Sequence, residues 1–266
     1  MTALEKALTE FKEVEHAAQG KSLLHSVDAR AKTVVVFLYI IAVLSVRLDA
    51  LQGILLFWVF PIVGCAMGGI SYGEVLKKSL YTLPFIAFIG IFNPLFQREP
   101  ELYVGSVAIS RGWVEFVSIL VRGLLSVQMV LVLIMTTGFY RVCRGLGKMK
   151  MPAVFTTQLL LVYRYIYVLV EEAIDMDRAR KSRSYGRKGY SLKMWGTFVG
   201  QLLIRTVNRA QRIHLAMLSR GFNGGLPSMG SMRWRLSDTV FVAAGVLLFA
   251  ACRLLDVNLI FNHMRI

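Results

Sequence analysis

Several long segments of the chain are apolar and almost free of charge, and such segments are stable only where water is excluded. Five of these runs lie at residues 33–48, 51–70, 79–97, 114–138 and 238–252. A helix of about 20 apolar residues spans the hydrocarbon core of a bilayer. Hydrophobic residues make up 56% of the chain and charged residues only 18%, which is atypical of a globular domain. The runs predict an all-α membrane protein with five to six transmembrane helices.

The basic residues predict the sidedness of the chain. The formal net charge is +15, but nucleic-acid-binding proteins rarely carry repeated apolar runs of span length. Residues 171–235 hold 13 Lys or Arg and 4 Asp or Glu. Because Lys and Arg near span ends are retained in the cytoplasm, we expect this segment to be cytoplasmic. Its charges then face membrane lipids or protein partners rather than nucleic acid.

The apolar run at 152–170 presents a problem of topology. Residues 141–150 are also basic, so both ends of the run are expected on the cytoplasmic side, which a single crossing cannot achieve. Arg164 lies inside the run, and an arginine at the bilayer centre costs at least about 2.5–3.5 kcal/mol. We therefore interpret 152–170 as an interfacial or bundle-packed helix, with five crossings elsewhere. A sixth crossing requires that this run spans the membrane.

Two further patterns complete the predicted organisation. Residues 3–19 place apolar residues three and four positions apart, which predicts an amphipathic helix. A last helix is expected to start after Ser237 and Asp238, which are residues that cap helices. The predicted segments are an N-terminal region (1–30), a transmembrane bundle (31–140), a cytoplasmic or interfacial region (141–236) and a C-terminal transmembrane helix with its tail (237–266).

A short pattern, Ala-x-x-Ser-Arg-small-aromatic, occurs twice in the basic segment. The first copy runs from Ala179 to Tyr185 and the second from Ala216 to Phe222. Helical periodicity precedes each copy, from Tyr165 in the first case, and glycines follow each copy. We therefore expect a pair of long cytoplasmic helices, with one copy at the C-terminal end of each.

The arginines of the two copies, Arg183 and Arg220, are the main candidates for contacting a partner. A guanidinium group is a permanently charged planar fork that suits carboxylates and carbonyl groups. Tyr185 and Phe222 could anchor each copy to an apolar surface. The small neighbours that leave space around the arginines are Ser182, Ser184, Ser219 and Gly221. The alternative is that basic residues simply favour helix C-termini and remain solvated there, and the duplication weighs against it.

Other charged residues have both structural and functional interpretations. Arg122 and Arg164 lie in apolar runs, and we favour structural roles for both. Arg164 could pair with Glu171 or Glu172, or reach the interface by snorkelling. The acidic residues of this region could serve a membrane-bound enzyme or form a solvated helix edge. They are Glu171, Glu172, Asp175 and Asp177.

No pattern predicts catalysis, a cofactor or a metal site in this chain. The segment from Gly145 to Lys148 has the wrong spacing for a phosphate-binding loop, so ATP is not expected to be hydrolysed here. The four histidines are scattered, and the three cysteines have no zinc or redox spacing.

Several segments, in order, resemble the transmembrane T components of energy-coupling factor transporters, and most closely the cobalt/nickel branch called CbiQ or NikQ. The resemblance extends from about Leu24 to Pro227. The segment from Asp28 through Arg30 to Lys32 is similar to the family's Asp-Pro-Arg-x-Lys motif, and the two arginine copies are similar to its paired Ala-Arg-Gly or Ala-Arg-Ser signatures. Further similarity lies at Arg122–Leu125, at Thr136 and Thr137, and from Tyr163 through Glu171 and Glu172 to Arg180.

Three departures from the family pattern are visible. Ala29 stands where proline is usual, Gly138 follows the threonines where proline is common, and serine replaces alanine before Arg183 and Arg220. Serine is small enough to leave the reach of each arginine intact.

The resemblance implies a non-catalytic scaffold in the plasma (inner) membrane, with two coupling helices in the cytoplasm. It implies two cytosolic ABC-type ATPase subunits, which bind ATP and Mg²⁺ and receive Arg183 and Arg220. It also implies a substrate-binding S component similar to CbiM or NikM, with a small accessory membrane subunit as a further candidate. The substrate would be cobalt or nickel. A conventional ABC permease with its own translocation path and, less favoured, a membrane-bound enzyme are the alternatives.

Overall fold

The computed structural model describes residues 22–46, 51–96, 100–104, 107–184, 191–225 and 234–263, with scattered positions before residue 22. The chain divides into two compact units. We call Glu15–Gly138 with Ser231–Ile266 the bundle unit, and Met1–Val14 with Phe139–Gly230 the long-helix unit. The amphipathic helix predicted at 3–19 lies mostly outside the described residues.

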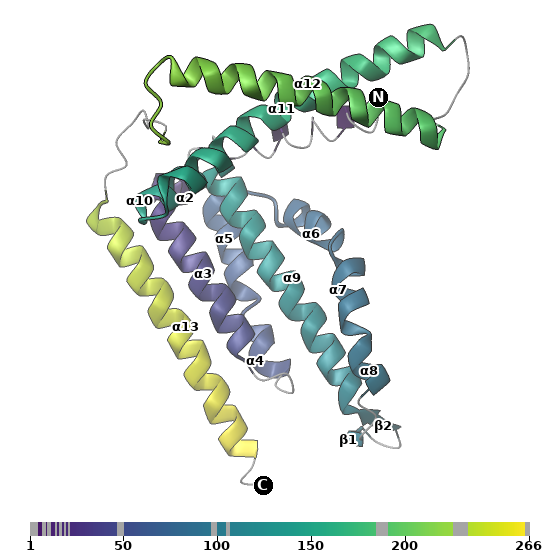
Figure 1. Ribbon diagram of the computed structural model, residues 1–266. Coiled ribbons are helices and arrows are strands. Elements are labelled where there is room, and N and C mark those ends of the chain that lie inside the picture. Colours follow the sequence, from purple (N-terminus) through teal and green to yellow (C-terminus); the bar gives the residue numbers. More distant parts are fainter. Residues whose placement is uncertain are drawn as a thin grey trace. The chain divides into compact units, whose positions relative to one another are not determined.

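Helix α9 (Arg111–Thr137) is central to the bundle unit (Figure 1). Its packing partners are α3 (Ala29–Ser45), α4 (Leu51–Leu56), α5 (Val59–Gly68), α6 (Tyr72–Leu80), α7 (Leu83–Gly90) and α8 (Phe92–Phe96). The short α2 (Leu23–Ser26) precedes α3, and α13 (Leu236–His263) packs on α3 and α4. An antiparallel hairpin of β1 (Pro100–Val104) and β2 (Val107–Ser110) connects α8 to α9.

Two of the predicted apolar runs are broken. The run at 51–70 forms α4 and α5, separated by a turn in which the N–H groups of Phe57 and Trp58 donate to carbonyls three residues earlier. The run at 79–97 begins inside α6 and bends by 48° between α6 and α7. Pro84 lies in the first turn of α7, where its missing N–H disrupts no helical hydrogen bond.

An aromatic cluster joins three parts of the bundle unit. Tyr39 of α3 is fully buried, and its hydroxyl donates to the Phe57 carbonyl over 3.0 Å. Phe249 of α13 packs edge-on against Tyr39, with the ring centres 5.6 Å apart. Such pairs add about 0.5–1.5 kcal/mol beyond the burial of apolar area. The cluster therefore fixes α3 against α13 and against the turn before α5.

The long-helix unit contains α10 (Phe139–Lys148), α11 (Ala153–Arg183) and α12 (Leu192–Leu218). Helix α11 is continuous over 31 residues. The run at 152–170 and the helix predicted from Tyr165 are therefore parts of one helix. Helices α11 and α12 cross each other (Figure 1).

Three described helices are long and apolar enough to cross a membrane: Gly112–Thr137, Ala153–Arg183 and Leu236–Leu254. The bent pair of α6 and α7 makes a fourth candidate if it counts as one span. These helices confirm the predicted all-α membrane class, while the total of five to six crossings stays a prediction. Only 6% of the most apolar stretch of α11 is buried by other described residues, and the interpretation of 152–170 as an interfacial or bundle-packed helix stays a prediction.

Candidate functional site

The two copies of the repeated pattern lie at the C-terminal ends of α11 and α12, as predicted. Helix α11 ends at Arg183, with Ser184 as its cap, whereas α12 ends at Leu218 and is followed by Ser219 and Arg220. Arg183 and Arg220 are both exposed. Neither arginine makes an ion pair with another described residue.

The two helices direct these ends away from each other. Within the long-helix unit, α11 and α12 run in opposing directions, so that their C-terminal ends lie at opposite ends of the crossed pair (Figure 1). Arg183 and Arg220 therefore cannot enter a single small site. The arrangement suits two separate partner surfaces.

The second copy ends α12 in a Schellman motif. The Phe222 N–H donates to the Met217 carbonyl over 3.0 Å. The Gly221 N–H donates to the Leu218 carbonyl, also over 3.0 Å, which completes the paired pattern of this cap. Gly221 has a φ of +78°, a left-handed conformation that costs glycine little because it has no Cβ. Arg220 is thereby held between two hydrogen-bonded backbone positions.

The serine before each arginine makes the same local hydrogen bond. The Ser182 hydroxyl donates to the Arg178 carbonyl over 3.1 Å. The Ser219 hydroxyl donates to the Leu215 carbonyl over 3.0 Å, again four residues earlier. Each hydroxyl is thus satisfied by its own helix and leaves the neighbouring guanidinium available.

The residues after the arginines differ between the copies. The Ser184 hydroxyl donates to the Lys181 carbonyl over 3.0 Å, whereas Gly221 supplies a left-handed turn. Phe222 is half-buried, and Tyr185 lies outside the described residues. The anchoring role of the two aromatic residues stays a prediction.

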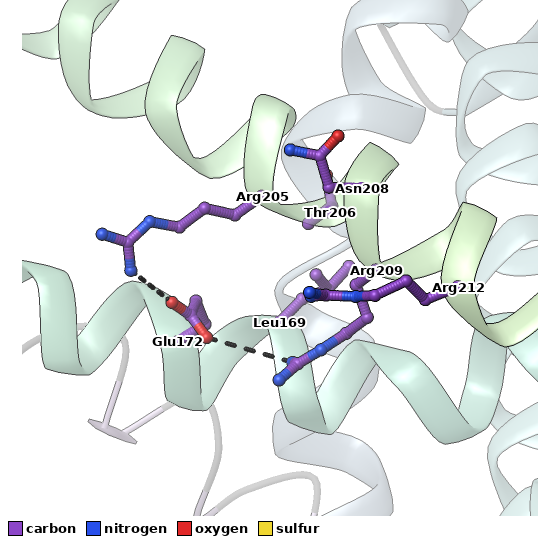
Figure 2. Close-up of a pocket in the computed structure, with 7 residues that line it drawn as sticks. All are labelled: Leu169, Glu172, Arg205, Thr206, Asn208, Arg209 and Arg212. Atoms are coloured by element: carbon purple, nitrogen blue, oxygen red, sulfur yellow. Dashed lines mark hydrogen bonds and ion pairs between the residues drawn. The ribbon is translucent and has the colours of Figure 1, made fainter.

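Glu172 of α11 connects to two arginines of α12 (Figure 2). One carboxylate oxygen lies 2.7 Å from Arg205, and the other lies 3.9 Å from Arg209. The Glu172 side chain is 26% exposed and that of Arg205 is 58% exposed. Exposed ion pairs contribute only about 0–1 kcal/mol, so these contacts add little to the stability of the crossing.

Glu171 and Arg164, the other supporting candidates, have different surroundings. Both side chains are exposed. The Arg164 guanidinium lies 5.7 Å from the centre of the Tyr165 ring. The predicted pairing of Arg164 with Glu171 or Glu172 is not observed, because two helical turns, about 11 Å, separate Arg164 from these carboxylates. Glu172 instead pairs with α12.

Further carboxylates of α11 are also engaged in ion pairs. Asp177 is buried and lies 2.6 Å from Lys181 and 3.5 Å from Arg180. Asp175 lies 3.8 Å from Arg178. Within the described ranges, no group of three His, Cys, Asp or Glu side chains could hold a metal ion. The ion pairs of Asp175 and Asp177 lie within α11, and that of Glu172 connects α11 to α12.

Residues 28–32 tie together three helix ends of the bundle unit. Asp28 caps α3 by accepting the Arg30 N–H over 2.9 Å. The Asp28 N–H donates to the carboxylate of Asp238 in α13 over 2.9 Å. Lys32 is 3% exposed and donates to the Thr136 carbonyl near the end of α9 over 3.3 Å. We call these contacts the helix-end clamp, which holds the start of α3 to the start of α13 and the end of α9.

Asp238 is a structural residue that sequence reasoning placed incorrectly. Helix α13 begins at Leu236, so Asp238 lies inside the first turn rather than before it. Its second carboxylate oxygen accepts the Arg235 N–H over 2.8 Å, which is one half of a capping box. Its hydrogen bond to Asp28 joins residues that are 210 positions apart in the sequence. The residues around Asp238 do not indicate such a distant partner.

Arg122 also contacts a helix end. It is 7% exposed and lies on α9, and its guanidinium donates to the carbonyl of Leu44 over 3.4 Å. Leu44 belongs to the last turn of α3, where unpaired carbonyls attract a cation. This geometry supports the structural role favoured for Arg122.

Comparisons with known proteins agree with these features. The cobalt transport protein family, CbiQ, matches residues 20–232. The energy-coupling factor transporter transmembrane protein EcfT of Lactococcus lactis subsp. cremoris is 25% identical over 247 residues, covering 86% of this chain and 92% of its own length. The cobalt transport protein CbiQ of Rhodobacter capsulatus is 30% identical over 81 residues, covering 30% of this chain and 33% of its own length.

A third relative carries the name of a fused cobalt transport protein, CbiMQ, from Methanocorpusculum labreanum. It is 34% identical over 93 residues, covering 35% of this chain and 16% of its own length. The family match itself includes α11, α12, both arginine copies and residues 28–32. The chain therefore belongs to the cobalt transport protein family CbiQ, as a CbiQ-like transmembrane component of the energy-coupling factor type.

Proposed function

We propose that this chain is the transmembrane scaffold of an ATP-driven importer in the plasma (inner) membrane, where it couples two cytosolic ABC-type ATPases to a substrate-binding membrane subunit. One observation carries the proposal. Two equivalent, exposed arginines lie at the C-terminal ends of two crossed helices that point in opposing directions. The family match supports a transport role for the whole scaffold.

Each arginine enters a groove of one ATPase and pairs there with carboxylates or backbone carbonyls. The Schellman motif and the two serine hydrogen bonds keep the guanidinium groups at defined helix ends. When ATP and Mg²⁺ draw the ATPases together, the two ends are displaced and the crossing angle of α11 and α12 changes. Glu172, which bridges the helices through Arg205, transmits this displacement between them.

The ATPases perform the hydrolysis, and this chain supplies no catalytic residue or cofactor site. The membrane partner is an S component similar to CbiM or NikM, with a small accessory membrane subunit as a further partner. The name of the fused relative, CbiMQ, supports a CbiM-like partner. Cobalt or nickel is the transported ion, bound by the S component.

Charge reversal at the two arginines tests the coupling role. The complex is purified in mild detergent, ATPase copies are counted by mass, and uptake of radioactive cobalt or nickel is measured in vesicles. Arg183→Glu and Arg220→Glu should each remove one ATPase copy, and the double variant should abolish uptake. Lys77→Glu makes the same charge change at an exposed position of α6, outside both arginine copies, and should retain both ATPases.

Two outcomes would reject the proposal. One is a double variant that keeps both ATPases and full uptake. The other is substrate bound within this chain and transported without a separate substrate subunit, which would instead establish a conventional permease.

A further inference from the structure

A cleft between α11 and α12 carries more positive charge than its single carboxylate neutralises (Figure 2). Its volume is about 310 Å³. Its lining residues are Leu169 and Glu172 from α11 and Arg205, Thr206, Asn208, Arg209 and Arg212 from α12. Three guanidinium groups against one carboxylate leave an excess of two positive charges.

The excess charge is concentrated at Arg209 and Arg212. Arg205 lies 2.7 Å from Glu172, whereas Arg209 remains 3.9 Å from it. Arg212 forms no ion pair with a described residue, and its side chain extends towards Arg209 (Figure 2). Like charges three or four residues apart on a helix repel each other, so an anion that bridges Arg209 and Arg212 would be stabilising.

The chemistry favours a phosphate group with two negative charges. Two guanidinium forks can each donate a pair of hydrogen bonds to phosphate oxygens. A phosphate monoester carries about −1.5 to −2 charges at pH 7, which matches the excess, whereas the phosphodiester of a common anionic lipid carries only about one. Asn208 adds a neutral amide that can donate to phosphate oxygens, whereas the Thr206 hydroxyl already donates to the Leu203 carbonyl over 2.7 Å.

The position of the cleft on α12 favours a soluble ligand over a lipid. Trp195, Val199, Leu203 and Val207 follow each other at four-residue spacing and are 47–61% exposed. This apolar stripe lies on the side of α12 away from Arg205 and Arg212, as a rotation of about 100° per residue requires. If the stripe faces lipid or another membrane protein, the cleft faces water.

We propose that Arg209 and Arg212 form a binding site for a soluble phosphate dianion, either inorganic phosphate or a phosphomonoester, in the cleft between α11 and α12. This site is separate from the coupling role proposed for Arg183 and Arg220. Those two arginines are unchanged in every variant used to test it, and the measurement needs no ATPase.

Equilibrium dialysis of the full chain in a zwitterionic detergent, with radioactive inorganic phosphate at constant ionic strength, measures the site directly. Arg212→Gln should weaken binding roughly tenfold, since a hydrogen-bonded guanidinium is removed. Glu172→Gln should strengthen binding, because it raises the excess charge from two to three. Lys193→Gln removes one exposed charge from the same helix outside the cleft and should leave binding unchanged.

The opposite signs expected for the arginine and glutamate variants separate a ligand site from a simple brace between helices. Arg212 is exposed, and size-exclusion chromatography checks that its replacement leaves the fold intact. Absence of saturable phosphate binding would overturn the proposal, as would equal losses in Arg212→Gln and Lys193→Gln. A parallel titration with phosphatidylglycerol tests whether the phosphate group belongs to a lipid. If this lipid displaces phosphate at a lower concentration than a soluble phosphomonoester does, the cleft binds lipid and the proposal is overturned.

Discussion

Replacing Asp238 with alanine is expected to open the helix-end clamp. Asp238 is 1% exposed, and its carboxylate accepts backbone hydrogen bonds from Asp28 over 2.9 Å and from Arg235 over 2.8 Å. Alanine provides no acceptor for either N–H group. The start of α3 would then lose its hydrogen bond to α13, and α13 would lose the cap of its first turn.

The expected magnitude follows from these two hydrogen bonds. A hydrogen bond to a charged group contributes about 1.5–3 kcal/mol, so the pair contributes about 3–6 kcal/mol. Removing a buried carboxylate also removes its desolvation penalty, which offsets part of the loss. We expect the free energy of unfolding to fall by about 2–4 kcal/mol. At roughly 2–4 °C per kcal/mol for a chain of this size, the Tm falls by about 4–16 °C.

Thermal unfolding in one mild detergent at a fixed scan rate measures the effect, because an irreversible transition makes the Tm depend on scan rate. Asp175→Ala is the matched control, since that side chain is 76% exposed and lies 3.8 Å from Arg178. The control should change stability by less than about 0.5 kcal/mol. Asp238→Asn keeps one acceptor oxygen, so its Tm should lie between those of Asp238→Ala and Asp175→Ala. If Asp238→Ala and Asp175→Ala unfold at the same temperature, the clamp does not stabilise the fold.

Two further predictions concern the long-helix unit. Burial raises the pKa of the Cys143 thiol from 9.0 to about 11, so in a Cys65→Ala, Cys252→Ala chain at pH 9 iodoacetamide should react roughly 50-fold more slowly with native than with denatured protein. Equal rates would contradict the burial. Gly221→Val should cost about 1–2 kcal/mol at the left-handed φ of +78° and speed amide exchange in the last turn of α12. Gly221→Asn should have a smaller effect, and equal exchange in both variants would refute the role of the turn.

Sequence patterns predicted the features whose determinants are local. The run at 114–138 corresponds to α9, Arg111–Thr137, because apolar periodicity and stop signals act within a turn or two. The ends of α11 and α12 were predicted for the same reason. Glycines and basic residues follow the last apolar positions closely, and the second end depends on Gly221 itself.

Breaks and pairings that depend on distant segments could not be predicted. No charged residue marks the end of α4 inside the run at 51–70. The run at 152–170 and the helix predicted from Tyr165 were separate in the sequence, but they form one continuous helix in which Arg164 is exposed beside the Tyr165 ring. The pairing of Glu172 with Arg205 depends on how two long helices rotate and cross. The same segment contains many other acidic and basic residues, and the sequence does not indicate which of them pair.

The residues behind the family resemblance separate into two kinds once their contacts are known. Asp28, Arg30 and Lys32 have partners inside the bundle unit, so their chemistry is accounted for by holding helix ends together. Arg183 and Arg220 are exposed at helix ends and form no ion pair among the described residues, although the backbone around Arg220 is tightly hydrogen-bonded. Ordering the base of a side chain while leaving its charged end exposed costs entropy that no internal contact recovers. In the proposed function, a separate partner at each of the two helix ends supplies the compensating interaction.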